Sequence, residues 1–189
     1  VIEYFSAIGE ASGLDLAVHV YPSWTRASYS LETLAGLARL RHVKLFKVGT
    51  REMNKYARDI QAIREAAPEK TVLTCHDEYL LASMVQGLDG GLLGFASFIP
   101  ELILELIEAV RAGDLRRAMA CQERINPLKD IVYGMGEPTG DAHARMKLAM
   151  VMAGRLKSAA VRPPTKQPDE ATRAQIAKVL KAAGMLHRE

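Results

Sequence analysis

A lysine in the stretch VKLFKVGT, residues 43–50, could act as a nucleophile. Lys47 stands between Phe46 and Val48 in what reads as a buried strand. Burial lowers the pKa of an amine from its ordinary value of about 10.4, and a neutral amine can act as a nucleophile. The alternative is a lysine whose long stem reaches water from a strand end. Lys44, which has the opposite parity on the strand, fits that description better.

Two further side chains with acid–base chemistry, His19 and Tyr21, lie at the end of the apolar run at residues 14–20. Alternate residues of a strand point to the same face, so the two rings could face the same way, about 7 Å apart along the strand. Either could move protons, and histidine is the side chain that titrates closest to neutral pH. The alternatives are a packed histidine with one hydrogen bond and a tyrosine at a pocket rim.

The elements that must position these residues alternate along the first 113 residues. Four apolar runs alternate with helical patterns, which indicates βα units and a parallel sheet whose strands are covered on both faces. A doubly wound sheet and a (β/α)₈ barrel both remain open on this pattern alone. The runs lie at residues 14–20, 43–49, 71–76 and 90–97, and the helical patterns at 1–12, 31–40, 51–66, 77–87 and 99–113, followed by three more at 114–135, 141–157 and 168–184.

Composition narrows the class of protein. The 189 residues are 49% hydrophobic and 25% charged, with a net charge of only +3 and no concentrated basic run. Nucleic acid is therefore not expected as the main partner, because phosphate binding needs such a patch. No apolar run approaches the ~20 residues of a membrane span, so no membrane partner is expected. Cys75 and Cys121 form no disulfide framework and no metal motif, which favours a reducing cytoplasm.

Five segments together resemble the dihydrodipicolinate synthase / N-acetylneuraminate lyase family: HVYPSWT, FKVGT, TCHDE, GLDGGLLGFAS and MKLAMVMAGRLKSAAVRPP. These are class I, Schiff-base-forming aldolases and dehydratases on a (β/α)₈ barrel. The resemblance covers essentially the whole chain but only the second half of the family's fold. It implies the C-terminal half of a (β/α)₈ TIM barrel, with four βα units, at residues 1–113, and a C-terminal helical region at residues 114–189.

The resemblance assigns the chemistry to Lys47, which matches the family's Schiff-base lysine on the sixth strand. It implies a lyase that joins this lysine to pyruvate or another 2-oxo acid for aldol cleavage, condensation or dehydration. The imine acts as an electron sink for a neighbouring carbanion, so we expect no cofactor and no metal.

The fifth-strand motif departs from the family pattern. Aligned on Pro22 and Thr25, His19 occupies the position of the family's catalytic tyrosine, and Tyr21 lies two residues further on. Either is therefore expected to be the acid–base group. Trp24 replaces an arginine that usually holds a substrate carboxylate, which suggests a more apolar substrate or a carboxylate bound elsewhere.

The remaining motif positions are expected to bind substrate. By the resemblance, small residues at the end of the eighth strand form pocket wall, and His76 lies at the top of the seventh strand. Asp77 is expected to cap the following helix. The expected substrate-binding residues are Trp24, Thr25, His76, Gly94 and Phe95.

The family's first-half motif, a Gly-Thr-Thr segment, is absent from the sequence. Four strands cannot close an eight-stranded barrel, so we expect that this chain alone is not a complete catalytic barrel. Either it is part of a longer enzyme, or a partner chain supplies the rest. The helices at residues 114–184 are expected to form oligomer contacts, in a homodimer or homotetramer. The alternative function is a truncated or non-catalytic paralogue with a binding or structural role.

Overall fold

A computed structural model describes residues 1–25, 28–134 and 140–186, apart from the Trp24 side chain. The chain divides into two compact units, one of Val1–His76 with Ala82–Leu92 and one of Asp77–Leu81 with Leu93–Glu189. These units reflect packing, and the division expected at residue 113 stays a prediction.

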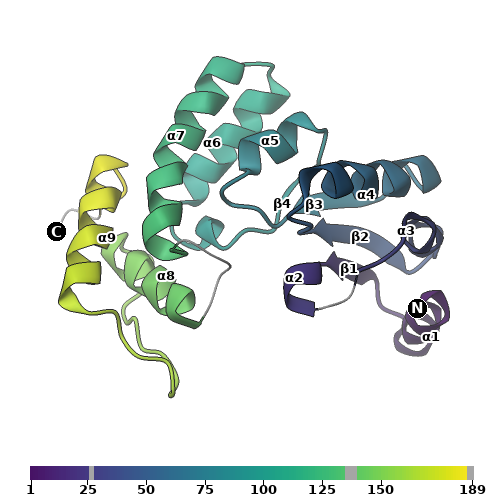
Figure 1. Cartoon of the computed structure of the whole chain (residues 1–189), viewed down its shortest axis with the longest axis horizontal. Helices are drawn as coiled ribbons and strands as arrows, with labels where there is room; N and C mark the ends of the chain where they lie inside the picture. Colours follow the sequence, from purple (N-terminus) through teal and green to yellow (C-terminus); the bar gives the residue numbers. More distant parts are fainter. Residues whose placement is uncertain (26–27, 135–139, 187–189) are drawn as a thin grey trace. The chain divides into compact units, whose positions relative to one another are not determined.

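The first unit is built on a parallel four-stranded sheet in the order β1-β2-β3-β4 (Figure 1). Each strand pairs with the next in sequence, as in consecutive βα units. Lys47 is the register partner of His19 in β1 and of Leu73 in β3. The strands are β1 (Leu16–Val20), β2 (Val43–Val48), β3 (Thr71–Thr74) and β4 (Gly90–Gly91).

Two helices of this unit, α3 and α4, begin at residues whose side chains accept free backbone N–H groups. Ser30 accepts a hydrogen bond from the Thr33 N–H, and the Glu52 carboxylate accepts the N–H groups of two residues. Figure 1 shows α3 and α4 running beside the sheet. The helices are α1 (Ile2–Ser12), α2 (Pro22–Thr25), α3 (Leu31–Ala38), α4 (Met53–Ala66) and α5 (Leu80–Val85), of which the last has residues in both units.

The two faces of the sheet differ in burial. On the face toward the helices, the strand side chains are fully buried with residues of α3 and α4: Val18, Val20, Phe46, Val48, Val72, Leu34, Leu37, Tyr56 and Ile63. On the opposite face Ala17 and His19 are exposed, and Leu45, Lys47 and Leu73 are half-buried. Because the strands of parallel sheets are normally covered on both sides, this open face is the unusual feature of the unit.

The second unit is helical. Asp114 and Asp169 cap two of its helices by accepting backbone N–H groups at position N3. Across the part of the chain that the structure describes, no helix is long and apolar enough to span a membrane. The elements are η1 (Phe95–Ser97), α6 (Pro100–Arg111), α7 (Leu115–Val132), α8 (Gly140–Met152) and α9 (Glu170–Ala182).

Three expected elements differ in the structure. The strand expected at residues 90–97 is only β4 followed by the short helix η1, and the loop expected after Tyr21 contains α2. The helix expected from residue 77 begins at Leu80. The Asp77 carboxylate accepts a hydrogen bond from Phe95 and one from Tyr133, so it does not have the capping role that we expected.

Candidate active site

The carboxyl ends of β1 and β2 bring two candidate catalytic side chains together. His19 and Lys47 are register partners, each one residue before the end of its strand, and both lie on the open face of the sheet. Side chains of directly paired residues on one face are neighbours. The imidazole and the amine therefore stand side by side at the edge of the sheet where α/β proteins collect functional groups.

Tyr21 joins this pair just beyond the end of β1. Its ring stacks on that of His19, with 5.4 Å between the ring centroids and 30° between the planes. From the spacing of the two residues along the strand, we expected both rings on one side of the sheet. The structure brings the two rings into contact. We refer to Lys47, His19 and Tyr21 as the lysine cluster.

Gly49 leaves the space that this arrangement needs. A Cβ atom at Gly49 would lie 2.3 Å from the Cys75 Sγ and 2.9 Å from the Tyr21 Cδ2. Both distances are shorter than any real contact of a Cβ atom, so the ring and the thiol occupy the room that another side chain would take. Sequence reasoning did not identify this role of Gly49, since a glycine after a strand usually marks only a turn.

The electrostatics favour a neutral imidazole. Partial burial lowers the pKa of His19 below its ordinary value of 6.5, and the positive charge of Lys47 lowers this pKa further. A neutral imidazole can accept a proton, which is what a general base at this position must do.

A buried network fixes the chain just after Lys47. The Thr50 hydroxyl donates to the Asp59 Oδ2 at 2.8 Å, and the Lys55 Nζ donates to the Asp59 Oδ1 at 2.6 Å. Asp59 is fully buried in α4, and both of its oxygens accept a hydrogen bond. The network ties the segment that follows β2 to α4.

His76 lies apart from the lysine cluster. Its side chain is 1% exposed, its Nε2 lies 3.0 Å from the Thr50 carbonyl oxygen, and its ring is 5.3 Å from that of Tyr56. These contacts place the ring on the side of the sheet that α4 covers. Substrate binding by His76 stays a prediction.

The other predicted substrate-binding residues stay predictions too. Thr25 donates its hydroxyl to the Tyr21 carbonyl oxygen at 2.8 Å, and the Trp24 side chain lies outside the described part. Gly94 and Phe95 belong to the second unit. The Phe95 ring is fully buried there, and the Phe95 N–H already donates to the Asp77 Oδ1.

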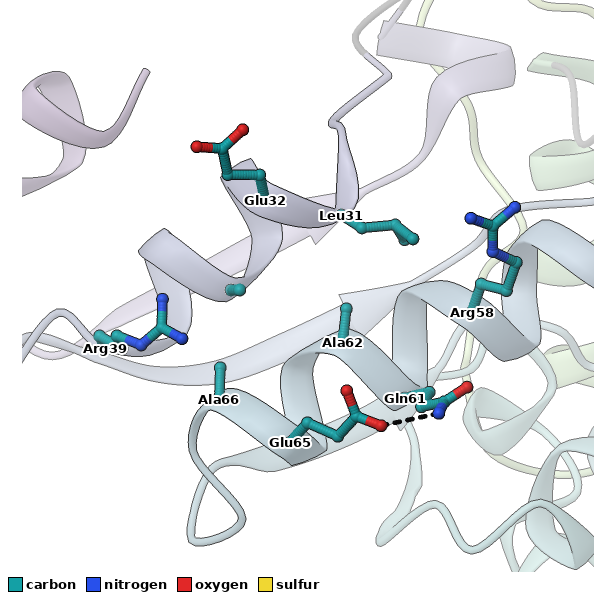
Figure 2. A pocket seen from close by; sticks show the side chains of 9 residues that line it. Leu31, Glu32, Arg39, Arg58, Gln61, Ala62, Glu65 and Ala66 are labelled. Atoms are coloured by element: carbon teal, nitrogen blue, oxygen red, sulfur yellow. Dashed lines mark hydrogen bonds between the residues drawn. The ribbon is translucent and has the colours of Figure 1, made fainter.

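A pocket of about 380 Å³ lies elsewhere, between α3 and α4 (Figure 2). Negatively charged carboxylates and positively charged guanidinium groups line this pocket. Gln61 donates a hydrogen bond to Glu65, one helical turn further along α4. No member of the lysine cluster lines this pocket, and its groups show no nucleophile paired with a base. The lining residues are Leu31, Glu32, Ala35, Arg39, Arg58, Gln61, Ala62, Glu65 and Ala66.

Comparisons with known proteins identify the family. The model of the dihydrodipicolinate synthetase family matches residues 1–183. The chain is 28% identical over 186 residues to a 4-hydroxy-tetrahydrodipicolinate synthase of Acidiphilium cryptum (strain JF-5), covering 98% of this chain and 61% of that protein. It is also 28% identical over 171 residues to an N-acetylneuraminate lyase of Mediterraneibacter gnavus, covering 87% of this chain and 50% of that protein.

Solved structures show the same fold. The crystal structure of YagE from Escherichia coli K12, a prophage protein of the dihydrodipicolinic acid synthase family in complex with pyruvate, superposes with a TM-score of 0.86 at 24% identity. The match covers 97% of this chain and 61% of YagE. The expected fold class, the C-terminal half of a (β/α)₈ barrel followed by helices, is confirmed. The chain spans about three fifths or less of the length of the relatives named here.

Proposed function

Since the chain belongs to the dihydrodipicolinate synthetase family, we propose that Lys47 forms an imine with pyruvate or another 2-oxo acid, as part of a lyase. Relatives named as synthases and as an N-acetylneuraminate lyase support a lyase, and the pyruvate bound to YagE supports a 2-oxo acid. Aldol cleavage, condensation and dehydration can all proceed from such an imine.

The proposal rests on the arrangement of three side chains. Lys47 is paired in register with His19, and the Tyr21 ring stacks on the His19 ring. A nucleophilic amine needs a neighbouring group that takes and returns protons during imine formation. The cluster supplies an amine, an imidazole and a phenol at the carboxyl ends of two adjacent parallel strands. In barrel enzymes that end of the strands holds the active site.

The proposed steps follow from these groups. The neutral Lys47 amine adds to the C2 carbonyl of the 2-oxo acid, and a proton from Tyr21 or His19 lets the C2 oxygen leave as water. The resulting iminium draws electrons from C3, so loss of a C3 proton to the same base gives an enamine. The enamine then attacks an aldehyde in condensation, or forms when a C3–C4 bond breaks in cleavage. Hydrolysis of the imine returns the free lysine.

Exchange of the pyruvate methyl protons in D₂O tests this function without knowledge of the second substrate. If the enamine forms, the intact protein should replace these protons with deuterium far faster than buffer does, and NMR should show the methyl signal decaying. The Lys44→Arg variant should exchange like the wild type, because Lys44 is exposed at the other end of β2. If neither pyruvate nor several other 2-oxo acids exchange their C3 protons, this result would favour the non-catalytic paralogue.

The open face of the sheet leads to a proposal about assembly. Ala17, Leu45 and Leu73 leave apolar surface uncovered beside Lys47, and within the described residues β1 and β4 are not paired with each other. We propose that a second barrel half covers this face, supplied either by a longer chain or by a partner chain, and that the complete protein is a homodimer or homotetramer. Cys75 and Cys121 form no disulfide within the described residues, and we keep the cytoplasm as the proposed location.

Association of the 189-residue chain by itself tests that proposal. Sedimentation velocity at rising concentration should show reversible association, because the uncovered face favours contact with another apolar surface. Leu73→Glu should weaken this association by placing a charge on the open face. Leu104→Glu, at an exposed leucine of α6, is the matched control. A chain that stays monomeric and binds no hydrophobic dye would contradict the proposed open face.

A further inference from the structure

The pocket between α3 and α4 opens on the outer side of these helices (Figure 2). Toward the sheet, the two helices bury Leu34, Leu37, Tyr56 and Ile63 completely. The residues that line the pocket come from the other faces of α3 and α4 and are exposed or half-buried. A second barrel half that covers the open face of the sheet would therefore leave this pocket uncovered, because the open face is on the opposite side of the sheet.

Four charged side chains of this pocket alternate in sign. Glu32 and Arg39 are seven positions apart on α3, and Arg58 and Glu65 are seven positions apart on α4. Seven residues make about two helical turns, so the two members of each pair lie on one face of their helix. The negative residue comes first on α3, whereas the positive residue comes first on α4.

The two helices run in the same direction, because α3 follows β1 and α4 follows β2 in a parallel sheet. A second hollow, of about 260 Å³, lies at the starts of both helices, and Leu31 and Arg58 line both hollows. Figure 2 shows Arg39 at the opposite end of the pocket. Glu32 and Arg58 therefore mark the amino end of the pocket, and Arg39 and Glu65 mark its carboxyl end.

Three of these four charges are unpaired within the part of the chain that the structure describes. The side chains of Glu32, Arg39 and Arg58 form no hydrogen bond or ion pair there, although groups of the opposite sign line the same pocket. Glu65 accepts its hydrogen bond from the neutral Gln61. The pattern of charges is thus left available to another molecule.

We propose that the outer α3–α4 pocket is a twofold contact surface for a second copy of this chain. A twofold axis that lies in the contact plane, either along the helices or across them, brings each of the four charges opposite a charge of the other sign on the partner copy. Small side chains between the charges let the two copies approach closely: Ala35, Ala62 and Ala66. A closed tetramer built from dimers needs two different twofold contacts, and this surface supplies one of them.

The strength of this contact should depend on salt. Exposed ion pairs each contribute little to affinity, but they orient the two copies and are screened by ions. Sedimentation velocity of the 189-residue chain should therefore show an association that weakens from about 0.1 M to about 1 M salt, as the Debye length falls from about 10 Å to about 3 Å. Leu73→Glu should leave this salt-sensitive part unchanged, because Leu73 lies on the open face of the sheet.

Charge reversal tests the pattern itself. Arg39→Glu with Arg58→Glu makes all four charges negative, and Glu32→Arg with Glu65→Arg makes all four positive. In each variant alone the dissociation constant of the salt-sensitive association should rise at least about tenfold, because like charges then face each other. An equimolar mixture of the negative and the positive variant should restore the association.

A matched control separates this pattern from net charge. Arg41→Glu with Lys44→Glu changes the net charge as much as the negative variant does, at exposed residues outside the pocket. This control should associate like the wild type, and it should not restore association when mixed with the positive variant. Wild-type association of either reversed variant alone would overturn the proposal, as would a reversed pair that associates no better than the control mixture. None of these outcomes depends on imine formation, so they leave the proposed function to its own test.

Discussion

Borohydride reduction in the presence of pyruvate is expected to attach a reduced pyruvyl group to Lys47 of the intact protein and to leave Lys44 unmodified. The two lysines lie on the same strand, but Lys44 is exposed at its start, whereas Lys47 stands half-buried beside His19 near its end. Imine formation needs a neighbouring acid–base group and a neutral amine, and only the second lysine has such a neighbour in register. Peptide mass spectrometry after reduction would locate the adduct.

Lys47→Arg should abolish both the adduct and turnover. A guanidinium stays protonated at any pH at which the protein folds, so it retains the positive charge and cannot attack a carbonyl. The Lys44→Arg variant keeps the nucleophile and should be labelled like the wild type. Labelling at Lys44 instead would show that the wrong face of β2 had been assigned to the site. Absence of any adduct with several 2-oxo acids would favour the non-catalytic paralogue.

The strand that carries Lys47 could be predicted because both its residue types and its neighbouring segments indicate a strand. VKLFKV combines β-branched and apolar residues with a helix on either side, and the structure places β2 at Val43–Val48. The alternation of helices and strands likewise gave the parallel order, and the spacing of His19 and Tyr21 placed both rings on one side.

The contacts made by long-range packing could not be predicted. Asp77 has the sequence context of a helix cap, yet its partners are 18 and 56 positions away in the sequence. No local pattern reports such distances, because the free energy of burying a carboxylate depends on what surrounds it. The eighth-strand segment reads as apolar and glycine-rich, and it forms only two residues of strand because its glycines support turns as readily as extended backbone.

Comparing the activities of two variants, one at Tyr21 and one at His19, identifies the acid–base group. Tyr21→Phe removes only the hydroxyl, so its ring can still stack on His19. His19→Asn removes the imidazole and, with it, the stack, and leaves a polar side chain of similar size. A general acid–base group contributes about 10²–10⁴-fold to the rate, and the variant that lacks it should lose turnover of the 2-oxo acid by that factor. The other variant should lose far less. Tyr4→Phe and His143→Asn, at exposed positions, are the matched controls.

The pH dependence of the rate separates the two candidates further. If His19 is the base, kcat/KM should fall on the acid side as the imidazole is protonated. That fall should lie below the ordinary histidine value of 6.5, because burial and the Lys47 charge lower the pKa of His19. His19→Asn would then remove this limb along with most of the activity. If Tyr21 is the group, protonation of His19 should not limit the rate, so His19→Asn should keep most of the activity and the acid side of the pH profile of the wild type. Near-full turnover in both variants would mean that neither ring has this role, and that the group which moves protons at Lys47 comes from the other half of the barrel.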